Sequence, residues 1–253
     1  MFSILKYVLK NGLRDRLYAG LLLTIIIAFA VAIFLGSTMM VERNQSSLIY
    51  ALGSFRTILA LGMILFVGIN VSRAFENKEI EFILSKPVSR ERFIIGYVAG
   101  FFVANFLIML PVIAAILFIF EVNKIGFLFW NLSVLVENLL VISFCLLSCL
   151  ILKNSFLAIL SSIAFYTLSR MMGLFVMAID LPQNYNDVKN NTVAMALKFL
   201  SAIFPRLDLF AQSSWPTYGV SDNSTLYLIF FQSIIYLPLL IFMAFHDFKR
   251  KQF

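Results

Sequence analysis

Six stretches of the 253-residue chain are almost continuously apolar, and most polar residues lie between them. At a rise of about 1.5 Å per residue, a helix over each stretch is long enough to cross the ~30 Å hydrocarbon core of a bilayer. Strands of a membrane barrel are shorter and alternate in polarity, so the pattern predicts helices. The predicted spans are 17–40, 53–71, 93–120, 127–152, 155–179 and 226–245. The expected fold is an all-α integral membrane protein with one transmembrane domain over residues 1–253.

The composition excludes most other classes of protein. Hydrophobic residues make up 61% of the chain and charged residues 13%, and the mean hydropathy is +0.94. A soluble globule needs a polar shell, so a soluble enzyme, a secreted disulfide scaffold and a disordered chain are all excluded. Cys145 and Cys149 lie four residues apart in one apolar run without a nearby histidine, so we expect them to pack inside a helix.

The distribution of lysine and arginine predicts the orientation in the membrane. Thirteen of the 20 basic residues lie in the N-terminus, the segment 72–92, Lys153 and the C-terminus, whereas six, including Arg56, lie in the segments of the opposite side. The positive-inside rule therefore places both termini in the cytoplasm of a multi-pass protein of the cell (cytoplasmic or inner) membrane. The same rule accounts for the net charge of +7 without nucleic acid as a partner.

Two segments outside the spans carry further predictions. The start of the chain repeats apolar residues at helical spacing beside lysines, which predicts an amphipathic helix on the inner leaflet; an ordinary basic leader is the alternative. The apolar run that follows is too long for a cleaved signal peptide. The segment 181–225 is the predicted external loop. Its short apolar stripe, 193–204, fits an interfacial helix or a loop packed on the bundle, because it is too short to span.

The segment 72–92, between the second and third spans, is charged yet helical in pattern. Nine of the 21 residues from Arg73 to Phe93 are charged, so this stretch is not in lipid. Ile80, Ile83 and Leu84 fall on one helical face.

Phe75 and Phe82, seven residues apart, fall on another face of that predicted helix. Pro87 should end the helix at about Lys86, and Ser89 can cap the helix of the third span. One apolar face can lie on the bundle. The other has no partner in this chain and therefore predicts a docking surface for another protein.

At this segment the chain resembles the type-2 family of ABC transporter permeases, especially the branch that includes the permease of nitrous-oxide-reductase maturation. The matching residues are Glu76, Ile80-Glu81, Ile83-Leu84-Ser85, Pro87-Val88-Ser89-Arg90 and Gly96. Lys78-Glu79 stands where the family has Gly-Thr, and Tyr97 stands where it has lysine. The six spans, the amphipathic start and the large last external loop fit the family as well.

The resemblance implies a permease subunit that pairs with a second permease chain, expected to be an identical one. A separate cytoplasmic ABC ATPase would dock on the segment 72–92, and its ATP-driven dimerisation would open an export path between the two permeases. The implied coupling residues are Phe75, Glu76, Glu79, Phe82, Pro87, Ser89, Arg90 and Arg92. The chain has no Gly-x-x-x-x-Gly-Lys-Ser/Thr phosphate loop, so ATP should be bound by the partner. We expect no catalytic residue, cofactor or metal in this chain.

Glu137 and Arg170 are charged residues inside predicted spans. Each lies about 15 residues, or roughly 22 Å, from the inner end of its span, and the two spans are antiparallel neighbours. Charges at that depth are costly and usually face the interior, a cavity or each other. An ion pair that fixes helix packing, a role in a substrate pathway, and separate snorkelling to the interface all remain open.

Three other functions differ from transport by an ABC permease in the sequence features that they require. A membrane enzyme lacks support, because His246 is the one histidine and no nucleophile elbow is present. An ion-driven transporter would show an inverted repeat, which the sequence lacks. A membrane scaffold or signalling subunit moved by an ATPase remains the alternative, because its coupling helix would look the same.

Overall fold

The computed structural model describes residues 16–39, 42–78, 90–152, 154–180, 204–220 and 223–250, together with residues 195 and 199. Within these residues there are helices and no strands. Six helices are long and apolar enough to cross a membrane. They are α2 (Arg16–Ser37), α3 (Arg43–Glu76), α5 (Arg90–Ile119), α6 (Lys124–Ile151), α7 (Ser155–Asp180) and α10 (Asn223–Arg250). The predicted all-helical fold with six membrane helices is therefore confirmed, and the chain has the architecture of a multi-pass membrane protein.

Two predicted helices lie outside the described residues. They are the amphipathic helix at the start of the chain and the coupling helix of the segment 72–92, most of which falls at 79–89. The predicted interfacial helix at 193–204 is described only at three positions, of which Met195 and Phe199 are helical and exposed. These three predictions stay predictions.

Helix α3 is the clearest difference from the predicted spans. It has 34 residues and begins ten residues before the expected span 53–71, and it ends five residues after it. The added first turns are polar, from Arg43 to Ser47, and a helix outside lipid needs no apolar side chains. At about 1.5 Å per residue α3 is roughly 51 Å long, so it extends well beyond a ~30 Å hydrocarbon core.

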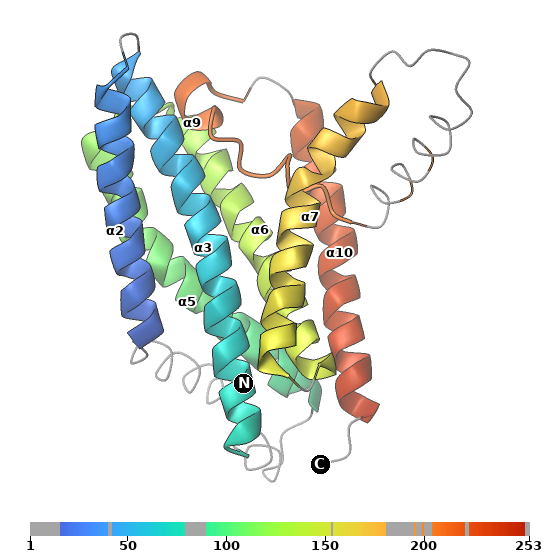
Figure 1. The fold of residues 1–253 in the computed structure, drawn as a ribbon. Coiled ribbons are helices and arrows are strands. Elements are labelled where there is room, and N and C mark those ends of the chain that lie inside the picture. The colour runs from blue at the N-terminus through green and yellow to red at the C-terminus, as the bar shows by residue number, and fades with distance from the viewer. Residues whose placement is uncertain are drawn as a thin grey trace.

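Helix α6 forms the centre of the bundle. It packs against α3, α5, α7, α10 and the short helix α9 (Trp215–Tyr218). In its most apolar window 72% of the residues are buried, against 17% in the windows of α2 and α10, which lie on opposite edges of the view in Figure 1. Both cysteines predicted to pack in a helix, Cys145 and Cys149, are buried and free in α6.

Close packing of α2 on α3 depends on small residues. A Cβ atom on Gly62 would lie 1.6 Å from Cδ1 of Leu21, and one on Gly36 would lie 1.7 Å from Oγ of Ser47. No side chain fits at such distances, so these glycines let the two helices approach. This is the role that small residues commonly have between membrane helices.

The two ends of the bundle differ. We call the end of the bundle at which α3 ends, at Glu76, and α5 begins, at Arg90, the coupling end, because these two helices flank the segment 72–92 in the sequence (Figure 1). We call the opposite end the loop end. There the segment 204–220, drawn in orange in Figure 1, folds back among α6, α7 and α10. Part of the predicted external loop is therefore packed into the bundle.

Candidate functional site: a buried arginine–glutamate–arginine cluster

Glu137 lies near the middle of α6 and is completely buried. Its Oε1 atom is 3.8 Å from Nη1 of Arg170 on α7, and its Oε2 atom is 4.0 Å from Nε of Arg56 on α3. Both distances are within the range of an ion pair. The structure thus brings Glu137 and Arg170 together, and it adds a second arginine on the other side of the carboxylate.

The prediction that Arg56 belongs to the basic residues outside the membrane, next to the start of the span at residue 53, is wrong. The structure instead places it in the interior of α3 with 6% of its surface exposed. A long guanidinium side chain near a span end is hard to assign from sequence, because snorkelling to the interface is its usual behaviour. When Arg56 is no longer counted on the outer side, the predicted excess of basic residues on the cytoplasmic side becomes larger.

The arginines hold the segment 204–220 as well as the glutamate. Nη1 of Arg56 donates to the carbonyl oxygen of Phe210 at 2.7 Å and to that of Ala211. Nη1 of Arg170 donates to the carbonyl oxygen of Leu207 and, at 3.5 Å, to that of Phe210. Hydrogen bonds from a charged donor are stronger than neutral ones, and inside a bundle they satisfy carbonyls that water cannot reach.

Neutral hydrogen bonds attach the same segment to α6, α7 and α10. The Ala211 amide donates to Oγ of Ser133 at 2.8 Å, and the Leu207 amide donates to the carbonyl oxygen of Ser169 at 3.2 Å. The Arg206 amide donates to Oε1 of Gln232 at 3.1 Å. Three helices and the cluster therefore fix the backbone of this segment at several points.

Apolar side chains complete the anchoring of the segment. Leu207, Phe210 and Ala211 are completely buried, and Trp215 is 3% exposed. The backbone also approaches α6 very closely, since a Cβ atom on Gly126 would lie 1.9 Å from the carbonyl oxygen of Trp215. Burial of this kind makes the segment part of the core rather than a surface loop.

The cluster contains more positive than negative side-chain groups. One carboxylate faces two guanidinium groups, and neither oxygen of Glu137 makes a hydrogen bond within the described residues. The hydroxyl of Tyr166 is a close electrostatic neighbour of the carboxylate. Carbonyl oxygens of the segment 204–220 supply the remaining negative partial charge. The positive charge is therefore stabilised by the loop as well as by Glu137.

A second contact holds the segment at the rim of the loop end. The hydroxyl of Tyr218 donates to Oε2 of Glu42 at 3.2 Å and lies 3.1 Å from Oε1 of Gln45. Loss of hydration and the adjacent Glu42 carboxylate raise the pKa of the Tyr218 phenol above its usual value. The phenol is therefore protonated at neutral pH and acts as a donor to α3.

The predicted coupling residues are placed only in part. Glu76 is exposed as the last residue of α3, Arg90 is the first residue of α5, and Arg92 is exposed. Phe75 is half-buried and packs against the core of the bundle, which the docking prediction did not anticipate. Glu79, Phe82, Pro87 and Ser89 lie outside the described residues.

The predicted helix of the segment 72–92 does not continue from α3 without a break. Helix α3 ends at Glu76, and Lys78 has φ of 54°, in the left-handed region that interrupts a right-handed helix. Phe75 therefore lies in α3, ahead of this break, and Phe82 lies outside the described residues. The docking role of both stays a prediction.

The cluster contains no set of groups suited to a metal ion. Among the described residues no three histidine, cysteine, aspartate or glutamate side chains gather at one place. The chemistry available to the site is charge pairing and hydrogen bonding.

Comparison with known protein families and with curated proteins finds no match for this chain. The class shown by the structure is thus a polytopic α-helical membrane protein.

Proposed function

We propose that this chain is the membrane subunit of an ABC exporter, driven by a separate cytoplasmic ATPase. In this proposal two identical chains form the translocation path in the cell inner membrane, with both termini in the cytoplasm. The six membrane helices and the charged segment 72–92 between α3 and α5 support it. That segment resembles type-2 permeases, and this resemblance implies the ATPase as the partner.

One observation carries the mechanism. A single uninterrupted helix, α3, joins the coupling end to the buried cluster. Arg56 and Glu76 lie 20 residues apart on it, which corresponds to about 30 Å. A helix of this length is stiff, so a displacement of its end by the ATPase moves Arg56 as well.

In this mechanism the cluster holds the segment 204–220 in place at the loop end. With Arg56 and Arg170 bonded to the carbonyls of Leu207, Phe210 and Ala211, the segment 204–220 closes that end. A shift of α3 withdraws the guanidinium of Arg56 from the segment. Glu137 remains beside both arginines and lowers the cost of breaking those bonds, because each cation keeps an anionic partner.

The first test is purification of the tagged chain from its native membrane in mild detergent, with mass spectrometry of the proteins that accompany it. We expect a P-loop ATPase with the wild type and its loss with Phe82→Asp. Phe118→Asp is the matched control, because it makes the same change at an exposed phenylalanine near the other end of α5. Absence of an ATPase from the wild-type sample, or its retention by Phe82→Asp, would contradict the proposal.

A second measurement separates transport from the alternative of a scaffold or signalling subunit. Ala211→Cys places a thiol at a completely buried position of the segment 204–220, in a chain whose own cysteines are buried. Transport predicts that a water-soluble maleimide reacts with this thiol when the ATPase is trapped with ATP, and not in its absence. A scaffold predicts no reaction in either state.

A further inference from the structure

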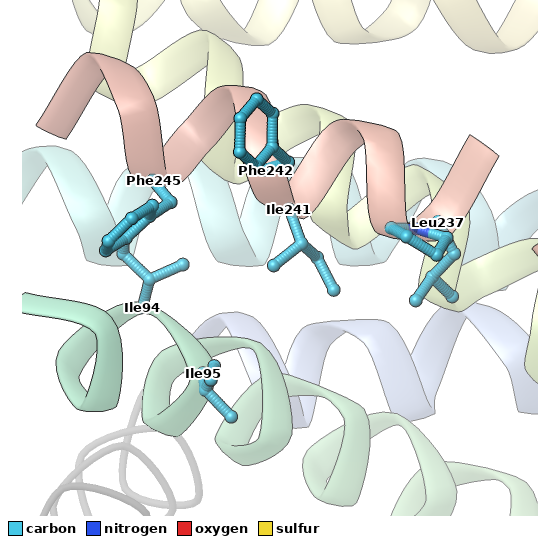
Figure 2. A pocket seen from close by; sticks show the side chains of 7 residues that line it. Ile94, Ile95, Leu237, Ile241, Phe242 and Phe245 are labelled. Carbon is cyan, nitrogen blue, oxygen red and sulfur yellow. The ribbon is translucent and has the colours of Figure 1, made fainter. Parts of the chain in front are cut away.

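An apolar groove lies between α5 and α10 on the outer surface of the bundle. It encloses about 560 Å³, within the range of sites that bind small molecules. Figure 2 shows Ile241 and Leu237 pointing from α10 toward α5, and Phe245 lying over Ile94 at one end of the groove. Phe242 and Ile95 are exposed on its rim, so the groove opens toward lipid.

The groove ends near the coupling end, and each of its walls carries a basic residue there. The Nζ atom of Lys249 on α10 lies 4.2 Å from the ring centroid of Phe245. Arg92 on α5 is exposed and lies three residues, about one helical turn, before Ile95. The rings of Phe93 and Phe248 stack at a centroid distance of 5.2 Å, which joins the two walls at this end.

The sequence around this end is basic as well. Arg90 precedes Arg92, and Arg250 and Lys251 follow Lys249, against the acidic Glu91 and Asp247. An apolar groove that ends at a positively charged rim matches a molecule with hydrocarbon chains and an anionic headgroup. Inner leaflets are rich in such lipids, and basic residues near the surface attract them.

We infer that the groove between α5 and α10 is a binding site for an anionic phospholipid. One acyl chain lies along Ile95, Ile241 and Phe242, and the phosphate of the headgroup contacts Lys249 and Arg92. This assignment does not depend on the proposed transport function. It needs only the groove and the charges at its end.

The test uses the full chain in mild detergent and native mass spectrometry. Phosphatidylglycerol or phosphatidylcholine with identical acyl chains is added, and the bound lipid is counted for each. We expect the wild type to retain phosphatidylglycerol at least about tenfold better, since each basic residue near the headgroup contributes to the preference. Lys249→Gln should remove most of the difference. Lys249 lies outside the predicted ATPase-coupling residues, so this result is independent of ATPase docking.

Two variants test the hydrocarbon part of the site. Ile95→Trp and Ile241→Trp fill the groove from opposite walls, and each should reduce retention of both lipids severalfold; two positions are used in case one variant does not fold. Ile26→Trp on α2, at a position that is 67% exposed, and Lys124→Gln at the loop end are the matched controls and should bind like the wild type.

Three outcomes would overturn the inference. The first is equal retention of the two lipids by the wild type. The second is unchanged retention by folded Ile95→Trp or Ile241→Trp, or an equal loss in the controls. The third is a dimer that the groove-filling variants convert to monomer without any change in bound lipid, because a second copy of the chain would then occupy the groove.

Discussion

The guanidinium of Arg56 lies beside the carboxylate of Glu137, with Nε 4.0 Å from Oε2, although one residue comes from α3 and the other from α6. This contact joins the helix that leaves the coupling end to the most buried helix of the bundle. Arg170 approaches the same carboxylate from α7. Three membrane helices therefore share one buried negative charge.

Replacement of Glu137 should be the most damaging single change in the cluster. Glu137→Gln leaves the buried Arg56 and the half-buried Arg170 without their anion, and breaking a buried pair in this way costs about 3–5 kcal/mol. Thermal unfolding in detergent checks this with a thiol-reactive dye, since Cys145 and Cys149 are buried and become reactive on unfolding. Glu121→Gln, at an exposed position, is the control. Equal melting temperatures of the two variants would refute the prediction.

The double variant Glu137→Gln with Arg170→Gln measures how the stabilisation by Glu137 is divided between the two arginines. If Glu137 paired with Arg170 alone, removal of both would restore most of the lost stability. Because Arg56 also contacts the carboxylate, we expect the double variant to recover only part of the loss. Full recovery of the lost stability in the same dye assay would show that the contact between Arg56 and Glu137 does not stabilise the protein.

Arg56→Lys should loosen the segment 204–220 while the charge is retained. Arginine can bond to the carbonyls of Phe210 and Ala211 and face Glu137 at the same time, whereas a lysine ammonium has no such fork. We expect faster amide hydrogen exchange in the segment and a loss of roughly 1–3 kcal/mol. Arg43→Lys, at an exposed position of α3, should leave exchange unchanged. Unchanged exchange in both variants would contradict the role of the fork.

Gly126→Ala should destabilise the loop end because no space exists for a side chain. Its Cβ atom would lie 1.9 Å from the carbonyl oxygen of Trp215, so α9 must move away from α6. Gly20→Ala is a matched control in α2, where nothing lies within 4 Å of the new atom. Alanine there should be neutral or stabilising by up to about 1 kcal/mol, since it favours helix. The prediction fails if both variants melt at the same temperature as the wild type.

The predicted orientation can be checked by labelling single cysteines. Tyr218→Cys places a thiol at the loop end and Glu76→Cys places one at the coupling end, both at exposed positions. An impermeant maleimide should label Tyr218→Cys on intact cells and Glu76→Cys only after permeabilisation, if the coupling end is cytoplasmic. The reverse pattern would invert the topology and would exclude a cytoplasmic ATPase at the segment 72–92.

Hydropathy predicted the membrane spans well, but it did not predict how far a helix continues beyond its span. Most predicted boundaries lie within a few residues of those of α2, α5, α6 and α7, because runs of apolar residues must match the thickness of the bilayer. Helix α3 departs from the prediction at both ends, since its polar turns are helical in water as well. Its end at Glu76 could not be foreseen from spacing, because the backbone of Lys78 turns left-handed.

The class of protein, the number of membrane helices and the presence of Glu137 and Arg170 in the apolar region could all be predicted from the amino-acid sequence. That Arg56 joins them and that the segment 204–220 enters the bundle became visible in the folded structure alone. The physical reason is that membrane helices are apolar on nearly every side, so the sequence pattern does not show which face turns inward. Packing against neighbouring helices decides that, and with it which charges meet.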